Sequence, residues 1–133
     1  MNADFSMPIL VVDDYQTMVR IMRNLLKQIG YENVDDASNG AAALEKVRAK
    51  RYSLIISDWN MEPMTGLELL QHVRAEAGSA DTPFIMVTAE ADQKQVFKAL
   101  SNGATDYIVK PISPGTLEKK VRRLVNQIQG KAS

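Results

Sequence analysis

Polar side chains of three chemical kinds follow four short apolar runs of the sequence. ILVV ends at Asp13 and Asp14, LIIS at Asp58, FIMV at Thr88 and YIV at Lys110. Adjacent carboxylates repel one another and are normally kept ionised by a hard cation such as Mg²⁺, which prefers oxygen ligands. The set of carboxylates, hydroxyl and amine therefore predicts an acidic, Mg²⁺-dependent site for phosphoryl transfer.

Asp58 is the candidate nucleophile of this site. Mg²⁺ is usually held by one or two protein carboxylates, which leaves another carboxylate to attack phosphorus. An aspartyl phosphate would add negative charge, and the Lys110 ammonium, the Thr88 hydroxyl and Mg²⁺ could each bind one of its oxygens. Alone, Asp13 and Asp14 would more often form a turn or a helix N-cap, Thr88 a cap and Lys110 a solvated cation.

The spacing of apolar residues predicts an α/β fold. Strand-length runs alternate with helix-length amphipathic stretches, which is typical of a parallel sheet whose ligands bind at the carboxyl ends of the strands. All the candidate residues follow strands and should therefore converge on one rim. We expect strands at 8–12, 33–36, 52–57, 82–87 and 105–109.

The predicted helices differ in the strength of their apolar stripes. The first carries Met18, Ile21, Met22, Leu25, Leu26 and Ile29 and ends at Gly30; the second carries Leu44 and Val47; the third begins near Gly66. The fourth, from about Asp92 to Ser101, has a weak stripe and should pack loosely. The last sets Leu117, Val121, Leu124, Val125 and Ile128 on one face before a short polar tail.

Composition limits the classes of protein to which the chain can belong. Its 133 residues, 45% of them hydrophobic, predict one globular domain over 1–133. Lys plus Arg equals Asp plus Glu at 16 each, so no overall field favours DNA or a membrane surface. The absence of cysteine, of a leader and of a long apolar segment predicts a soluble cytoplasmic protein without membrane insertion. We expect it to be mainly a monomer, with dimerisation on activation left open.

An ordered series of motifs covers essentially the whole chain. It comprises LVVDD at 10–14, RNLLKQIGY at 23–31, ISDWNM at 56–61, GLELL at 66–70, MVTAEA at 86–91 and VKP at 109–111. In this series the chain resembles the receiver domains of two-component response regulators, and among them the CheY-like chemotaxis regulators. The resemblance implies a flavodoxin-like, doubly wound five-stranded parallel sheet in the order 2-1-3-4-5, flanked by five helices.

The resemblance also implies roles for individual residues. Asp58 would accept a phosphoryl group from a histidine kinase, with Thr88 and Lys110 binding the phosphoryl oxygens. Thr88 would then move toward the phosphate while Tyr107 turns inward. The Mg²⁺ ligands would be Asp14, Asp58, the backbone carbonyl of Asn60 and, partly through water, Asp13. Asn60 and Glu90 would line the path of the hydrolytic water.

On this interpretation the protein is a phosphoacceptor in signalling that catalyses only its own phosphorylation and dephosphorylation. With no room for a second output module, its output should be binding to a protein, such as the flagellar motor switch, through the fourth helix, fifth strand and fifth helix. A phosphorelay or phosphate-sink receiver is an alternative. A haloacid-dehalogenase-like phosphatase fits less well, because such enzymes carry DxDx[TV] after the first strand, whereas Tyr15 and Gln16 follow Asp14 here.

Other features receive simpler interpretations. Asp35 and Asp36 end an edge strand away from the crevice and are expected to be structural, and His72 should be solvated. Lys110-Pro111 resembles the cis peptide of the family. Pro63 and Thr65 depart from the usual loop pattern after the nucleophile, which leaves the loop geometry open. The basic residues of the last helix favour a solvated face over an acidic partner or a nucleotide: Lys119, Lys120, Arg122 and Arg123.

Overall fold

The computed structural model describes residues 5–89 and 92–132, with side chains up to Asn126. Five strands alternate with five helices along the chain. Their bounds are β1 Ile9–Val12, α1 Gln16–Gln28, β2 Val34–Ala37, α2 Gly40–Ala49, β3 Leu54–Asp58, α3 Gly66–Ala75, β4 Phe84–Thr88, α4 Gln93–Ser101, β5 Asp106–Val109 and α5 Pro114–Ala132.

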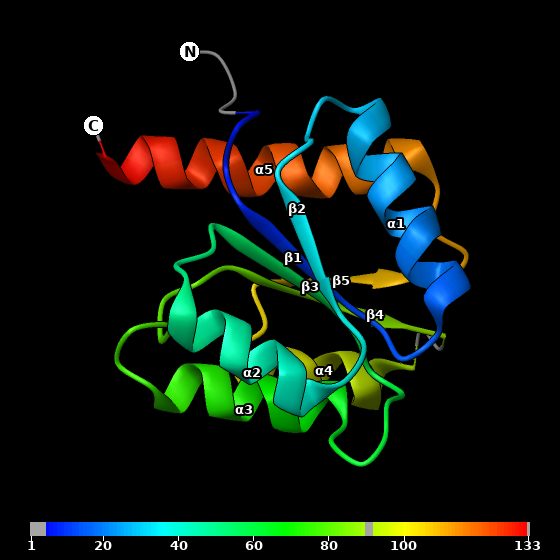
Figure 1. Ribbon diagram of the computed structural model, residues 1–133, viewed down its shortest axis with the longest axis vertical. Helices are drawn as coiled ribbons and strands as arrows, with labels where there is room; N and C mark the ends of the chain where they lie inside the picture. Colours follow the sequence, from blue (N-terminus) through cyan, green and yellow to red (C-terminus); the bar gives the residue numbers. More distant parts are fainter. Residues whose placement is uncertain (1–4, 90–91, 133) are drawn as a thin grey trace.

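The strands form one parallel sheet in the order β2-β1-β3-β4-β5, which confirms the predicted fold class and topology. Ile9 of β1 is in register with Val34 of β2 on one side and Leu54 of β3 on the other. Helices α1 and α5 cover one face of the sheet, and α2, α3 and α4 cover the opposite face (Figure 1). The fold therefore has three layers, with every strand carboxyl end at the same rim.

Two apolar clusters fill the spaces between the layers. Ile9 and Val11 point into the cluster under α1 and α5, whereas Leu10 and Val12 point into the cluster under α2, α3 and α4. Because both faces of the sheet are covered, the strands are continuous apolar runs without polar alternation. The buried sheet provides a rigid base for the residues at its rim.

Every observed strand begins one or two residues later than the sequence pattern predicts, so these boundaries were wrong in detail. Pro8, Tyr52, Ser53 and Thr82 precede the ladders, although Tyr52 and Thr82 are buried. An apolar or β-branched run reports burial, which can continue where the backbone has already left the sheet. Asp58 and Thr88 are the last residues of β3 and β4, one position inside the strands rather than after them.

The helices differ from the predictions in two details and agree in a third. Ile21 lies 42% exposed on α1, outside the stripe buried there, so its predicted core position was wrong. Helix α4 buries only Ala99 among its residues, as its weak stripe indicated. Helix α5 continues to Ala132, so the predicted polar tail is helical through that residue. The side chain of Ile128 lies outside those described.

Between residues 5 and 132, leaving aside the two undescribed positions, no helix is both long and apolar enough to cross a lipid bilayer.

Candidate functional site

The rim over the central strands collects the residues that sequence analysis singled out. Asp58 and Thr88 end the adjacent strands β3 and β4, Asp13 directly follows β1, and Lys110 directly follows β5. The chain order of the strands reverses between β1 and β3, because β2 lies beyond β1 and β4 beyond β3. Such a reversal opens a crevice at the carboxyl ends of the strands, and this is where the carboxylates lie.

Asp13, Asp14 and Asp58 form the acidic cluster. One carboxylate oxygen from each residue lies within 4.8 Å of the others, so a single cation could reach all three. Asp13 and Asp58 are 1% and 3% exposed, whereas Asp14 is exposed to solvent. The cluster thus combines two buried anionic groups with one at the entrance.

Asp13 carries the clearest electrostatic signature of the site. Its Oδ1 accepts a hydrogen bond of 2.9 Å from the Tyr15 amide, whereas its buried Oδ2 accepts none from the residues that the structure describes. Burial, helped by the neighbouring charges of Asp58 and Asp14, raises the pKa of the Asp13 carboxyl to about 6, although the Tyr15 amide and Lys110 oppose the shift. A buried carboxylate oxygen without a donor is suited to a metal ion.

Lys110 is the cation of the site. Its Nζ lies 2.9 Å from Asp58 Oδ1 as an ion pair, but that buried oxygen accepts no hydrogen bond of good geometry. One ammonium among three carboxylates leaves the cluster with net negative charge. Lys110 is joined to Pro111 by a cis peptide bond, in agreement with the resemblance, and Glu62 and Pro63 are joined by another.

The remaining predicted site residues lie around the crevice. Thr88 is 5% exposed, and its carbonyl accepts a hydrogen bond of 2.8 Å from the Lys110 amide, which ties together the ends of β4 and β5. Asn60 lies exposed in the loop after β3. Glu90 falls outside the described residues, so its predicted role has no structural counterpart here.

The loop after Asp58 depends on a residue that sequence analysis used only to mark a helix start. A side chain at Gly66 would bring Cβ to 2.1 Å from the Asp58 carbonyl oxygen, and the Gly66 amide donates 2.9 Å to the Trp59 carbonyl. Thr65 and Glu68 form a capping box that begins α3 at this point. Only a glycine permits this contact between helix and nucleophile strand. In the sequence, the glycine that opens the GLELL motif was the feature from which this close contact could have been predicted.

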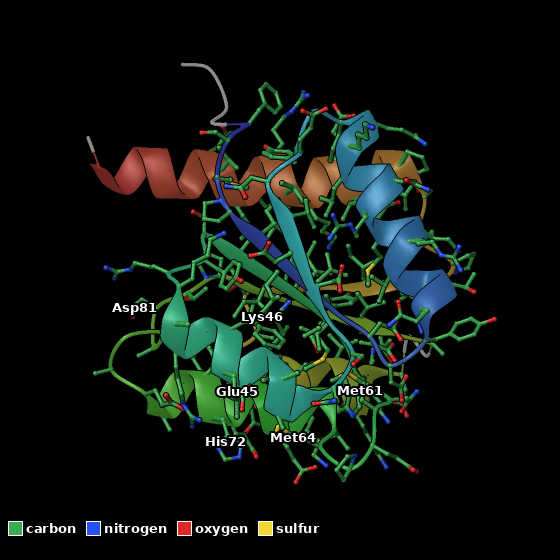
Figure 2. All side chains as sticks on the ribbon, viewed as in Figure 1. Glu45, Lys46, Met61, Met64, His72 and Asp81 are labelled. Atoms are coloured by element: carbon green, nitrogen blue, oxygen red, sulfur yellow. The ribbon has the colours of Figure 1, made fainter. Side chains whose placement is uncertain are left out.

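Methionines on the same loop connect it to α2. Met61 is buried, and Met64 lies over the start of α2, where a Cβ on Gly40 would come within 2.5 Å of its sulfur (Figure 2). The loop that carries Pro63 is therefore packed against the fold through these methionines. This gives the loop geometry that the sequence left open.

Two groups expected to be structural lie away from the crevice. Asp35 accepts hydrogen bonds from Tyr52 Oη at 2.7 Å and from Lys50 Nζ at 3.1 Å, and Asp36 pairs with Arg23 at 2.8 Å. The Tyr52 hydroxyl and Lys50 lower the pKa of Asp35 below its usual value. His72 lies exposed on the outer side of α3 (Figure 2).

An aspartate that ends a buried central strand, with further carboxylates and a lysine beside it, is an arrangement that could accept a phosphoryl group on that aspartate. The chain belongs to the response regulator receiver domain family, whose model matches residues 9–122.

Similar proteins include single-domain chemotaxis regulators. The chemotaxis protein CheY of Pseudomonas aeruginosa is 39% identical over 93% of this chain and 100% of its own length. The chemotaxis protein CheY-3 of Vibrio cholerae is 37% identical over 92% of this chain and 95% of its own. The solved structure of Vibrio cholerae CheY4 matches with a TM-score of 0.84 and 36% identity, over 90% of this chain and 98% of that one.

A further solved structure bears on the metal. The receiver domain of a sensor histidine kinase from Pseudomonas aeruginosa matches with a TM-score of 0.83 and 26% identity, over 91% of this chain and 98% of that one. That protein holds a magnesium ion in its active site cleft. Receiver domains bind Mg²⁺ at their acidic site. The buried Asp13 Oδ2, which has no hydrogen-bond donor among the described residues, and the three converging carboxylates fit such an ion here.

Proposed function

We propose that this protein is a response regulator whose Asp58 accepts a phosphoryl group from a histidine kinase and thereby changes its affinity for a protein target. One observation carries the proposal. Asp58 is 3% exposed at the end of β3, lies 2.9 Å from Lys110 and shares its crevice with two further carboxylates. We take residues 1–133 as a single receiver domain working in the cytoplasm.

Phosphoryl transfer requires an ionised Asp58. Its carboxylate oxygen forms a bond to phosphorus as the bond from phosphorus to the kinase imidazole nitrogen breaks, and the imidazole takes up a proton. Lys110 already lies at Asp58 Oδ1, so its ammonium can bind a phosphoryl oxygen once the phosphoryl group is attached there. The Thr88 hydroxyl would bind a second phosphoryl oxygen.

Mg²⁺ would be held by Asp13, Asp14, Asp58 and the Asn60 carbonyl, and would neutralise charge on the transferring phosphoryl group. The buried Asp13 carboxylate would remain ionised in its presence. Asn60 and Glu90 are our candidates for lining the approach of the water that hydrolyses the acyl phosphate. The protein thus catalyses its own phosphorylation and dephosphorylation and no reaction of a free substrate.

The signal would leave the site through Thr88 and Tyr107. Movement of Thr88 toward the phosphoryl group vacates space into which Tyr107 turns, and the surface of α4, β5 and α5 changes. The target we favour is a component of the flagellar motor switch, because several of the most similar relatives are named as chemotaxis proteins. A phosphorelay or phosphate-sink role is the second candidate, since one structural neighbour is the receiver domain of a sensor kinase.

The first experiment is intact-mass measurement after incubation with acetyl phosphate, with and without Mg²⁺. The native protein is expected to gain one phosphoryl group only with Mg²⁺ and to lose it with time, and Asp58→Asn should gain none. Asp81→Asn, on an exposed position far from the rim, is the matched control and should behave as the native protein (Figure 2). Equal labelling of native protein and Asp58→Asn would contradict the proposal.

A second experiment separates the two candidate pathways. Phosphorylated protein is passed over a purified flagellar switch protein and over a histidine phosphotransfer domain, with unphosphorylated Asp58→Asn as reference. The motor role predicts phosphorylation-dependent retention by the switch protein. Phosphoryl transfer to the histidine domain without retention by the switch protein would favour the relay.

A further inference from the structure

A partly buried ion pair lies beside Tyr107 at the outer edge of the sheet. Lys120 of α5 places its Nζ 2.9 Å from Asp106 Oδ1 and 5.0 Å from the centre of the Tyr107 ring. The same Asp106 oxygen accepts a hydrogen bond of 2.8 Å from the Tyr107 amide. Lys120 therefore interacts with both the ring of Tyr107 and the group that binds its backbone.

The two partners of Lys120 project from opposite faces of the sheet. Asp106 is in register with Ile85, which belongs to the core under α1 and α5, whereas Tyr107 is in register with Met86, which belongs to the core under α2, α3 and α4. Since side chains alternate along a strand, the Tyr107 ring lies on the α4 side. Lys120 thus reaches around β5, the edge strand, to contact it.

On the α4 side the Tyr107 ring lines a shallow groove of about 540 Å³ together with Val96, Phe97 and Leu100. Phe97 and Leu100 are 72% and 43% exposed, so the groove offers the ring little enclosure. The Lys120 ammonium contacts the ring from its other side. Turning the ring inward, toward Thr88, would break this contact.

The ion pair restricts the position of the Lys120 ammonium. The side chains of Lys120 and Asp106 are 23% and 12% exposed, so this pair is shielded from water more than the typical surface pair. Lys119, the adjacent residue, is exposed on α5. A fixed ammonium over an aromatic face is attractive because the ring quadrupole presents negative potential there.

We propose that Lys120 is a positioning residue for Tyr107: anchored by Asp106, it holds the ring in the groove-lining orientation and so sets how readily the protein leaves its resting state. The inference rests on the proposed function in assigning Tyr107 to the switch. The contacts of Lys120 described above are to Asp106 and Tyr107, neither of which belongs to the acidic cluster. Its loss should favour the inward ring without changing the chemistry at Asp58.

The test is the orientation of the Tyr107 ring in the unphosphorylated protein, read by NMR as the ratio of cross-relaxation to the Thr88 methyl and to the Leu100 methyls. Lys120→Met should raise the inward share by about two- to fivefold. Lys119→Met, with the same loss of charge on the same helix, should leave the ratio unchanged. Lys120→Arg keeps a cation over the ring and should stay close to the native protein.

Lys120→Met leaves the Asp106 carboxylate buried without its cation, which could destabilise the fold. A second variant is therefore needed to separate a change in ring orientation from a loss of stability. Asp106→Asn combined with Lys120→Met removes both charges and keeps an oxygen for the Tyr107 amide. It should show the same inward shift. An unchanged ratio in both Lys120 variants, measured in folded protein, would overturn the proposal.

Labelling with acetyl phosphate separates this result from a failure of the proposed function. Native yield of the Asp58 adduct in Lys120→Met, with a shifted ring, supports both. If the adduct forms but phosphorylation changes the orientation of the Tyr107 ring in no variant, Tyr107 is not part of the switch. That outcome would also overturn the role of Lys120. Absence of any adduct would contradict the proposed function, whereas the resting orientation in Lys120→Met would still report on the contact.

Discussion

At the scale of single residues, the carboxylates of the site are buried close together, which is unfavourable until a cation binds them. Asp13 and Asp58 lie buried within reach of one another. Among the described residues Asp13 Oδ2 has no hydrogen-bond donor, whereas Asp58 Oδ1 forms an ion pair with Lys110. Burial of a carboxylate oxygen without a partner costs free energy that folding must supply elsewhere. Such a site gains most from a bound cation, so the unpartnered Asp13 oxygen argues for a metal site more strongly than the Asp13-Asp14 sequence pair does.

Asp13→Asn is expected to stabilise the metal-free protein at neutral pH. The pKa of Asp13 is raised in the folded state from 3.8 to about 6, so folded protein binds this proton more tightly than unfolded protein does. The free energy of unfolding therefore falls as pH rises from about 4 to about 6. Replacement by the neutral amide should add about 1–2 kcal/mol at pH 7.5 and nothing near pH 4.

Urea unfolding at the two pH values, without Mg²⁺, measures this effect. Asp14→Asn is the control, since that carboxylate is exposed. Addition of Mg²⁺ should stabilise the native protein more than Asp13→Asn. A destabilised Asp13→Asn at pH 7.5 would show that the carboxylate is satisfied by groups other than a metal.

At the scale of elements, the start of α3 fixes the geometry of the nucleophile strand. Asn39 and Asp92 cap α2 and α4 through single side-chain hydrogen bonds, whereas α3 begins with a full capping box at Thr65. The next residue, Gly66, lies against the Asp58 carbonyl. The helix can approach the end of β3 this closely only without a side chain at that position.

Gly66→Ala should lower the stability of the fold and the yield of phosphorylated protein together. An added Cβ at 2.1 Å from the Asp58 carbonyl oxygen forces the loop or the strand end to shift. We expect a loss of about 2–4 kcal/mol and a reduced rate of labelling by acetyl phosphate. Thermal unfolding and intact mass report the two effects.

Gly78→Ala is the matched control for this substitution, because an added Cβ there meets no atom within 4 Å. It should leave labelling unchanged and alter stability by less than about 1 kcal/mol. Equal behaviour of the two alanine variants would mean that the Gly66 contact relaxes at no cost to the site.

At the scale of the whole molecule, the helices differ in how much apolar surface they bury against the sheet. Helix α1 buries Val19, Met22, Leu25 and Leu26 against the sheet, but α4 buries only Ala99 and leaves Phe97 and Leu100 exposed. Segments with little buried apolar surface open at low free energy. The least tightly packed helix is therefore the one beside Tyr107, where the proposed output surface lies.

Hydrogen exchange should reveal this difference directly. Amides of α4 are expected to exchange at least about tenfold faster than those of α1 and α3, because local opening of α4 exposes little apolar surface. Peptide-resolved mass spectrometry at neutral pH makes the comparison, with α1 as the internal reference. Protection of α4 equal to that of α1 would contradict the interpretation that it is loosely packed.

The sequence alone determined the α/β class, the number and order of the elements and the chemistry of the rim. Apolar runs long enough for strands, each closed by a polar residue, specify buried parallel strands and place Asp13, Asp58, Thr88 and Lys110 at their carboxyl ends. The succession of apolar runs and amphipathic stretches repeats along the chain, so it can be recognised from the sequence alone. Strand ends were less predictable, because burial of residues such as Tyr52 continues beyond the ladder.

Only the tertiary structure decided the contacts between residues far apart in the sequence. Three features depend on distances across the sheet: the shared reach of the three carboxylates, the ion pair of Asp58 with Lys110 and the place of Gly66 against β3. Lys120 shows this most clearly: on its helix it is one of four basic residues, and the sequence favoured a solvated face. Folding places it on Asp106 and Tyr107 because α5 runs beside the edge strand.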